Sequence, residues 1–326
     1  PKVGGIVRLT GFVIRSSLVM EGIGALCMLP VFCRDFGVSG IWKAIFHSVS
    51  AFCNAGFDLM GTPDTPFVSL TAYRADPVIS LTISALIVIG GIGFLTWDDV
   101  RTNRLHFHRY RLQSKVILTS TALLILLPTL YFFFFEFKGV TPQERLLLSL
   151  FQSITPRTAG FNTADYTSLS SSGRGLTILL MFIGGSPGST AGGIKTTTIA
   201  VLVANAFAVF RRQKSPEMFG RRMEEKAVHD AAAIFTLYLV LSLTGAFTIS
   251  TVEGLPLSEC LFETTSAIAT VGLSLGLTPH LGIVSQGILI FLMFIGRVGG
   301  LTMIYAALSG SKSSVARLPQ ERITVG

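Results

Sequence analysis

Charged side chains are scarce in this chain of 326 residues. Asp, Glu, Lys and Arg make up 13% of it, whereas soluble domains contain about 25%. Hydrophobic residues account for 50% of the chain, and the mean hydropathy is +0.62. This composition excludes an ordinary soluble domain and indicates a protein that crosses a lipid bilayer several times.

Cysteine is also sparse, and the four cysteines form no CxxC pair. Their spacing therefore supports neither a disulfide framework nor a zinc site. The sequence has no signal-peptide pattern. It begins at Pro1, and we expect a further segment upstream.

Basic residues are unevenly distributed. The net charge is +8, but 17 of the 26 Lys and Arg residues fall within four short segments. Two of these are the chain ends, and the others are 98–115 and 211–226. Lys and Arg concentrate in cytoplasmic loops, so we expect both termini and both linkers to be cytoplasmic. Membrane topology explains the charge and argues against a nucleic-acid partner.

One short pattern occurs three times: Phe, a polar residue, Ser or Thr, any residue, Ser or Thr, and a glycine further on. The copies start 105 and 111 residues apart (151−46 and 262−151), and the Phe-to-Gly distances are 10, 9 and 10. Such a recurrence indicates a repeated architecture. The copies begin at Phe46, Phe151 and Phe262 and lead to Gly56, Gly160 and Gly272.

Each copy lies between two long apolar segments. We predict short helices over 41–52, 143–155 and 256–268, which are too short to cross a bilayer. The predicted spans are 14–33, 77–97, 116–136, 175–210 (interrupted), 228–250 and 283–308. The expected fold is an all-α membrane protein built from hairpins, each a membrane helix, pore helix, filter loop and membrane helix, around a central pore.

We divide the chain into three repeats of this kind, 1–100, 101–213 and 214–326. They would be the second, third and fourth of four. A fourth repeat, preceding Pro1, is expected because three hairpins do not close a regular ring. The third range also contains the C-terminal tail.

The glycine loops have the composition expected of a cation filter. Backbone carbonyls can replace the water shell of a bare cation, and turning them to one side requires dihedral angles that glycine adopts freely. Neutral residues favour a large monovalent cation over calcium. The predicted filter residues are Cys53, Asn54, Ala55, Gly56, Thr158, Ala159, Gly160, Thr270, Val271 and Gly272. The alternative is that each glycine simply caps a helix.

The last membrane helix of the middle repeat is interrupted, and interrupted helices at membrane depth mark functional sites. We therefore interpret 184–196 as an intramembrane gate. A nucleotide-binding P-loop is the alternative, but Ile194 separates the required Gly-Lys pair. The predicted gate residues are Gly184, Gly185, Ser186, Pro187, Gly188, Ser189, Thr190, Ala191, Gly192, Gly193 and Lys195, together with Arg297 from the last span.

Charges within the apolar segments are costly and suggest function. Arg297 is expected to face the cavity below the filter, near the gate. Glu21 allows a functional or a structural role. Glu263, on the third short helix, would either concentrate cations at the outer mouth or support the packing of its helix.

These features resemble the Trk/Ktr/HKT superfamily of potassium transporters, and within it the KtrB-type membrane subunits of bacterial Ktr systems. The resemblance rests on the loops at Gly56, Gly160 and Gly272, the break at 184–196, and Arg297. It implies potassium (K⁺) transport without enzymatic chemistry or a covalently bound cofactor. It leaves open whether sodium (Na⁺) is a coupling or activating ion.

The resemblance also implies partners and a location. These are a cytoplasmic ring of RCK-type, KtrA-like nucleotide-binding subunits, a homodimer, and the plasma membrane of a bacterium. Two alternatives from other classes stay open at this point: a secondary transporter of an organic solute, and a membrane ATPase that uses the near-P-loop segment.

Overall fold

The computed structural model describes residues 3–65, 67–104, 106–213 and 215–299. Almost all regular structure in these ranges is helical. By length and composition, three of the described helices can cross a membrane, and a bent pair would make a fourth span. The apolar composition of the chain is thus concentrated in helices of membrane-spanning length.

Three long helices each precede one copy of the repeated pattern. They are α1 (Val3–Phe36), α5 (Leu112–Tyr131) and α9 (Glu225–Glu253). Helix α5 continues into a π-helical turn, Phe132–Glu136. Helices α1 and α9 contain the spans predicted from hydropathy, and α5 does so together with its π-helical turn. All three begin before the predicted starts, because a helix can continue beyond the apolar run.

The three short helices match the predicted ranges within two residues. They are α2 (Ser39–Phe52), α6 (Pro142–Ile154) and α10 (Leu257–Ile268). Helix α6 begins with Pro142 after Thr141, whose hydroxyl accepts a hydrogen bond from the Glu144 amide. Proline in the first turn after a capping threonine is a common helix start.

The helix after the first copy departs from its prediction. The range 77–97 was expected to form one continuous span, but α3 (Pro77–Gly91) ends and α4 (Phe94–Asn103) leaves at an angle of 96°. Gly93, between them, has a φ of +90°. Only glycine tolerates this conformation easily, so the sequence Gly90-Gly91-Ile92-Gly93 encodes a bend.

The middle repeat is interrupted as predicted. Helix α7 (Ser171–Phe182) and helix α8 (Thr196–Phe210) flank the 184–196 loop. A small antiparallel ribbon of β1 (Glu217–Met218) and β2 (Arg221–Arg222) follows α8. The last described helix is α11 (Ile283–Val298). The remainder of the predicted span 283–308 lies outside the described residues.

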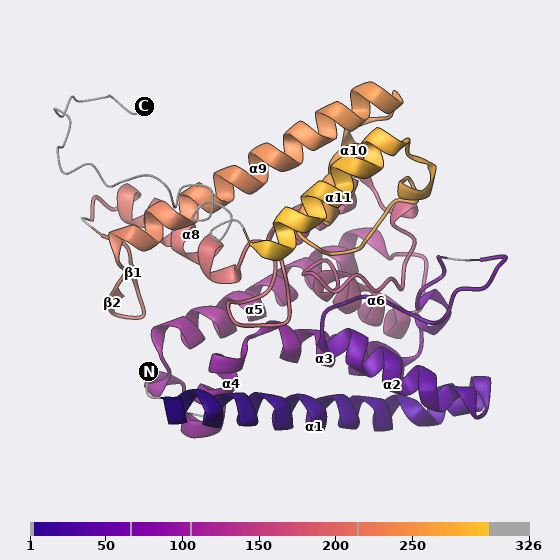
Figure 1. Ribbon diagram of the computed structural model, residues 1–326, viewed down its shortest axis with the longest axis horizontal. Helices are drawn as coiled ribbons and strands as arrows, with labels where there is room; N and C mark the ends of the chain where they lie inside the picture. Colours follow the sequence, from indigo (N-terminus) through magenta and orange to yellow (C-terminus); the bar gives the residue numbers. More distant parts are fainter. Residues whose placement is uncertain (1–2, 66, 105, 214, 300–326) are drawn as a thin grey trace.

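Figure 1 shows how these elements are arranged. Helices α1, α2 and α3 pack together on one side, and α9, α10 and α11 pack together on the other. Helices α5 and α6 lie between them, and α6 also contacts α3. Separate clusters of buried apolar side chains fill the first and the last of these groups.

An acidic side chain at the end of each long helix binds the segment just before the helix that follows the short helix, namely α3, α7 or α11. Asp35 accepts a hydrogen bond from the Tyr73 hydroxyl at 2.9 Å. Glu136 accepts one from the Ser170 amide at 3.1 Å. Glu253 accepts one from the Gly282 amide at 2.9 Å. These contacts hold the outgoing and returning helices of each group together.

Candidate ion-conduction site

Three loops follow the short helices and meet at one place. We call 53–58, 157–162 and 269–274 the first, second and third glycine loops. A Cβ atom added to Gly56 would lie 2.3 Å from the Ala159 carbonyl oxygen, and one added to Gly160 would lie 2.4 Å from that of Val271. The backbone of each of these two loops therefore touches the carbonyl that precedes the glycine of the next loop.

The backbone conformation is the same in all three loops. The glycine and the residue two positions before it both have positive φ: Asn54 and Gly56 at 50° and 72°, Thr158 and Gly160 at 70° and 82°, and Thr270 and Gly272 at 55° and 89°. Left-handed non-glycine residues are uncommon and mark functional or strained sites. A plain helix cap needs only one left-handed residue, so the second indicates a more specialised loop.

The second residue of the repeated pattern anchors the loop three residues beyond its glycine. His47 Nε2 accepts a hydrogen bond from the Leu59 amide at 3.3 Å. Gln152 Nε2 donates to Thr163 Oγ1 at 3.2 Å. A Glu263 carboxylate oxygen accepts from the Leu275 amide at 2.8 Å. Glu263 is 4% exposed, so the structure favours a supporting role over concentrating cations, although the carboxylate supports the loop and not only the packing of its helix.

The third residue of the pattern binds the preceding long helix. Ser48 Oγ donates to the Glu21 carbonyl at 2.6 Å. The Ser153 hydroxyl lies 2.8 Å from that of Thr129, and the Thr264 hydroxyl lies 3.5 Å from that of Ser242. Small hydroxyl side chains satisfy these buried contacts without separating the helices.

The fifth residue of the pattern shapes the glycine loop itself. Ser50 Oγ donates to the Phe57 carbonyl at 2.7 Å, and Thr155 Oγ1 donates to the Phe161 carbonyl at 2.6 Å. The accepting residue directly follows the glycine in both loops. The Ser-x-Ser signal that recurs along the sequence is therefore a set of anchors for the short helix and its loop.

The 184–196 loop is closed at its base. The Gly184 amide donates to the Ile194 carbonyl at 2.8 Å, and the Thr196 amide donates to that of Gly185 at 3.0 Å. Within the loop, Lys195 Nζ donates to the Ala191 carbonyl at 2.8 Å. The glycines permit these close backbone approaches.

This loop packs against the left-handed residue of each glycine loop. Thr190 Oγ1 lies 3.3 Å from Asn54 Oδ1. A Cβ atom on Gly184 would lie 3.2 Å from Thr158, and one on Gly192 would lie 1.9 Å from Thr270 Oγ1. The predicted gate residues and the predicted filter residues are thus brought into direct contact.

The bend between α3 and α4 also holds the 184–196 loop, a role that the sequence analysis did not assign. The Ser186 amide donates to the Gly91 carbonyl at 2.9 Å, and the Phe94 amide donates to the Gly188 carbonyl at 2.9 Å. The signal was the glycine cluster at 90–93, whose close spacing permits backbone approach.

Arg297 lies near the end of α11 and is exposed. Its positive charge interacts electrostatically with Lys195 of the 184–196 loop and with Cys53 of the first glycine loop. Arg297 is therefore within electrostatic range of one predicted gate residue and one predicted filter residue. Two like charges at this position repel each other, and water between them weakens the repulsion.

One charged residue within the glycine loops was overlooked by the sequence analysis, which treated the loops as neutral. Arg157 begins the second glycine loop and is 7% exposed. Within the described residues its guanidinium makes one hydrogen bond, a long one of 3.4 Å from Nη2 to Thr121 Oγ1. The signal was a basic residue directly before Thr158.

The comparison with protein families decides the class. A family model for cation transport proteins, TrkH, matches residues 9–315. The chain belongs to this family. It is therefore a cation transport protein and not an enzyme. In the described residues the sheet is a two-stranded antiparallel ribbon, which is no core for a nucleotide-binding P-loop.

Individual relatives agree with this assignment. The potassium/sodium uptake protein NtpJ of Enterococcus hirae is 39% identical over 340 residues, covering 100% of this chain and 73% of that protein. The Ktr system potassium uptake protein B of Bacillus subtilis is 36% identical over 333 residues, again covering 100% and 73%.

A solved structure supports the fold. The potassium transporter TrkH from Vibrio parahaemolyticus superposes with a TM-score of 0.74 at 19% sequence identity. The match covers 94% of this chain and 64% of that transporter. The chain is thus an all-α protein with the architecture of a multi-pass membrane transporter.

Proposed function

We propose that this chain conducts K⁺ through a filter formed by the three glycine loops. The filter residues are the ten predicted from the sequence: 53–56 in the first loop, 158–160 in the second and 270–272 in the third. Two observations carry the proposal together. Each loop has the same pair of left-handed residues, and the glycine of the first and second loops lies against a backbone carbonyl of the next loop. Carbonyl groups turned inward by such residues can replace the hydration shell of a cation.

The names of the relatives favour K⁺ as the cation. Both NtpJ and the Ktr protein are potassium uptake proteins, and NtpJ is also named for sodium. Na⁺ therefore remains a candidate coupling or activating ion. Glycine at positions 56, 160 and 272 fits K⁺, since no side chain narrows the proposed ion path at these points.

Within this proposal, 184–196 is the gate, because it lies against all three left-handed residues of the loops. Hydrogen bonds from the α3–α4 bend hold it in this position. Arg297 and Lys195 add positive charge that would repel a cation below the loops. Opening requires the loop to leave the glycine loops.

The organisation around the pore is also proposed. The three repeats, 1–100, 101–213 and 214–326, would surround the pore as hairpins. Several relatives are named as parts of Ktr systems, which supports a cytoplasmic RCK-type, KtrA-like ring as the partner that controls the gate. A homodimer in the bacterial plasma membrane, with basic linkers facing the cytoplasm, completes the proposal.

Uptake measurements test the filter. The complete gene is expressed in cells that lack their own potassium uptake systems, and K⁺ and Na⁺ uptake are measured side by side with the wild type and Gly160→Ser. We expect K⁺ uptake by the wild type and loss of selectivity in the variant. No K⁺ uptake by the wild type, with or without a Ktr-type partner, would refute the proposed function.

Shortening the 184–196 loop tests the gate. Removing Gly188 and Ser189 from its tip should raise K⁺ flux, because the loop would lose the Gly188 carbonyl that accepts from the Phe94 amide and would be held less firmly against the glycine loops. A deletion variant with wild-type flux and regulation would contradict the gate assignment.

A further inference from the structure

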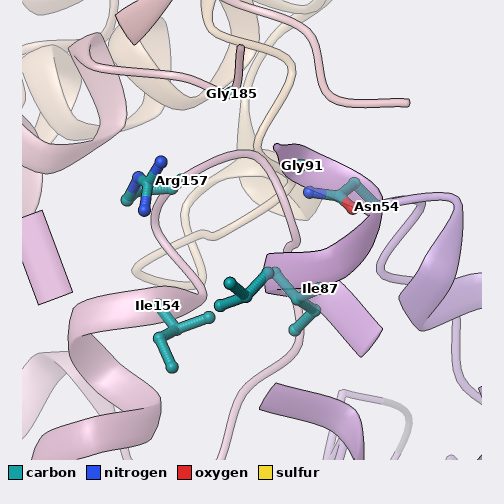
Figure 2. A pocket seen from close by; sticks show the side chains of 7 residues that line it. Asn54, Ile87, Gly91, Ile154, Arg157 and Gly185 are labelled. Atoms are coloured by element: carbon teal, nitrogen blue, oxygen red, sulfur yellow. The ribbon is translucent and has the colours of Figure 1, made fainter. Parts of the chain in front are cut away.

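A small cavity lies between two glycine loops and the 184–196 loop. Its volume is about 10 Å³, and its lining includes Asn54, Gly91, Arg157 and Gly185. Figure 2 shows Arg157 and Asn54 at opposite sides of this space, with Ile87 and Ile154 beneath and Gly185 above. A volume of this size holds roughly one water molecule.

Two polar atoms at this cavity have no hydrogen-bond partner among the residues that the structure describes. They are Arg157 Nε and the amide nitrogen of Asn54, both buried. Each side chain is 7% exposed. A buried donor without a partner is costly, and the cost is larger for a charged group. Two such atoms at one cavity indicate that a small polar molecule fills it.

We propose that one water molecule occupies this cavity and bridges Arg157 to Asn54. The effect of this water on ion selectivity rests on the proposed function, whereas the water site itself does not. Water accepts a hydrogen bond from Arg157 Nε. The Asn54 amide can turn by 180°, and a water molecule serves either orientation because it both donates and accepts. An anion would serve only the orientation with the amide nitrogen inward.

The backbone around the cavity offers further partners. The Gly91 carbonyl already accepts from the Ser186 amide, and the Gly185 carbonyl accepts from the Thr196 amide. Each carbonyl oxygen has a second lone pair. The water can thus reach the two to four polar partners that a buried water requires.

The position of this water gives it a role in transport. Asn54 belongs to the first glycine loop, Arg157 to the second, and Gly185 to the 184–196 loop. Thr190 of that loop also binds the Phe52 carbonyl, two residues before Asn54, at 3.0 Å. The water joins the three segments, and Arg157 becomes a positioning residue for the spacing of the glycine loops.

A matched pair of variants separates the hydrogen bond from the charge. In Arg157→Gln, the side-chain nitrogen takes the position of the arginine Nε, so a donor remains while the charge is lost. In Arg157→Met, a methyl group takes that position. We expect the K⁺/Na⁺ uptake ratio to fall about tenfold in Arg157→Met, as losing one buried hydrogen bond predicts, and to stay within about twofold of the wild type in Arg157→Gln.

Arg174→Met, in the same repeat and away from the cavity, is the control for loss of a cation and should behave as the wild type. If Arg157→Gln and Arg157→Met lose selectivity equally, the charge and not the water is responsible, and the proposal is wrong. If neither changes the ratio, Arg157 does not position the loops.

The site is tested independently on the complete wild-type protein. A high-resolution structure should show one density peak within hydrogen-bonding distance of Arg157 Nε and the Asn54 amide. A bromide-soaked crystal should show no anomalous peak there. An empty cavity, or a bromide peak, would overturn the water assignment even where K⁺ uptake is normal. If the wild type carries no K⁺, the proposed function fails while this measurement still decides the site.

Discussion

Replacing Gly56 by alanine tests the contact between glycine loops most directly. The new Cβ would lie 2.3 Å from the Ala159 carbonyl oxygen, where real Cβ atoms essentially never come closer than 3.0 Å. The first and second glycine loops must therefore separate by at least 0.7 Å (3.0−2.3). Gly56 also has a φ of +72°, and a left-handed alanine costs about 1–2 kcal/mol.

The displaced atom is a proposed K⁺ ligand, so selectivity should change together with stability. We expect the K⁺/Na⁺ uptake ratio of Gly56→Ala to fall about tenfold or more, equivalent to about 1.4 kcal/mol of differential binding. The control is Gly22→Ala in α1, whose Cβ would meet nothing within 4 Å. Alanine in this helix should stabilise the protein by roughly 0.5–1 kcal/mol.

Two measurements decide the matter: the uptake ratio in cells without other potassium systems, and the melting temperature of the purified protein. The two variants should shift the melting temperature in opposite directions. A Gly56→Ala protein that is well expressed and keeps the wild-type uptake ratio would refute the reasoning, since its loops would then not form the ion path.

Three further predictions concern other contacts. Gly192→Ala should push the 184–196 loop off the third glycine loop, because its Cβ would lie 1.9 Å from Thr270 Oγ1. K⁺ flux should therefore rise. Adding Thr270→Ala removes this clash and should lower the flux again. Equal flux in the single and double variants would contradict this. Glu263→Gln should lower the melting temperature, since the carboxylate also accepts from Ser274 and Thr278 at 2.8 and 2.7 Å; we expect a cost of about 1–3 kcal/mol, and Glu259→Gln is the control. Asp99→Asn should destabilise the α4–α5 corner, where the buried carboxylate accepts from the Arg111 amide at 3.0 Å and Ser114 at 2.6 Å. Asp98→Asn, which loses only a 3.7 Å ion pair on a half-exposed side chain, should melt near the wild type, and equal melting of the two would refute the assignment.

Much of the fold could be predicted because the signals are local. Apolar runs fix the long helices through the length that a bilayer demands. The short helices were placed within two residues because the same Phe and Ser or Thr pattern recurs in each of them and a loop glycine follows. The bend after Gly91 was missed because hydropathy does not distinguish a straight apolar helix from one broken by glycine.

The candidate site was less accessible to sequence reasoning. Which loops touch, and in what order, depends on contacts between residues about a hundred positions apart. The unpaired Nε of Arg157 also depends on its surroundings, because the sequence shows a basic residue but not which neighbouring groups can accept a hydrogen bond from it. Likewise, the contact of Thr190 with Asn54 follows only once the 184–196 loop has folded back.

The Phe-to-Gly distance of the second copy is one residue shorter than that of the others, and this difference has a consequence for symmetry. Its Ala159 amide bonds to the Thr155 carbonyl four residues earlier, whereas the Ala55 and Val271 amides bond to carbonyls five residues earlier. Identical subunits could not carry one unequal loop. A single chain can, so in the proposed filter an ion would meet a chemically different wall on each side, and a label or substitution can be introduced on one side alone.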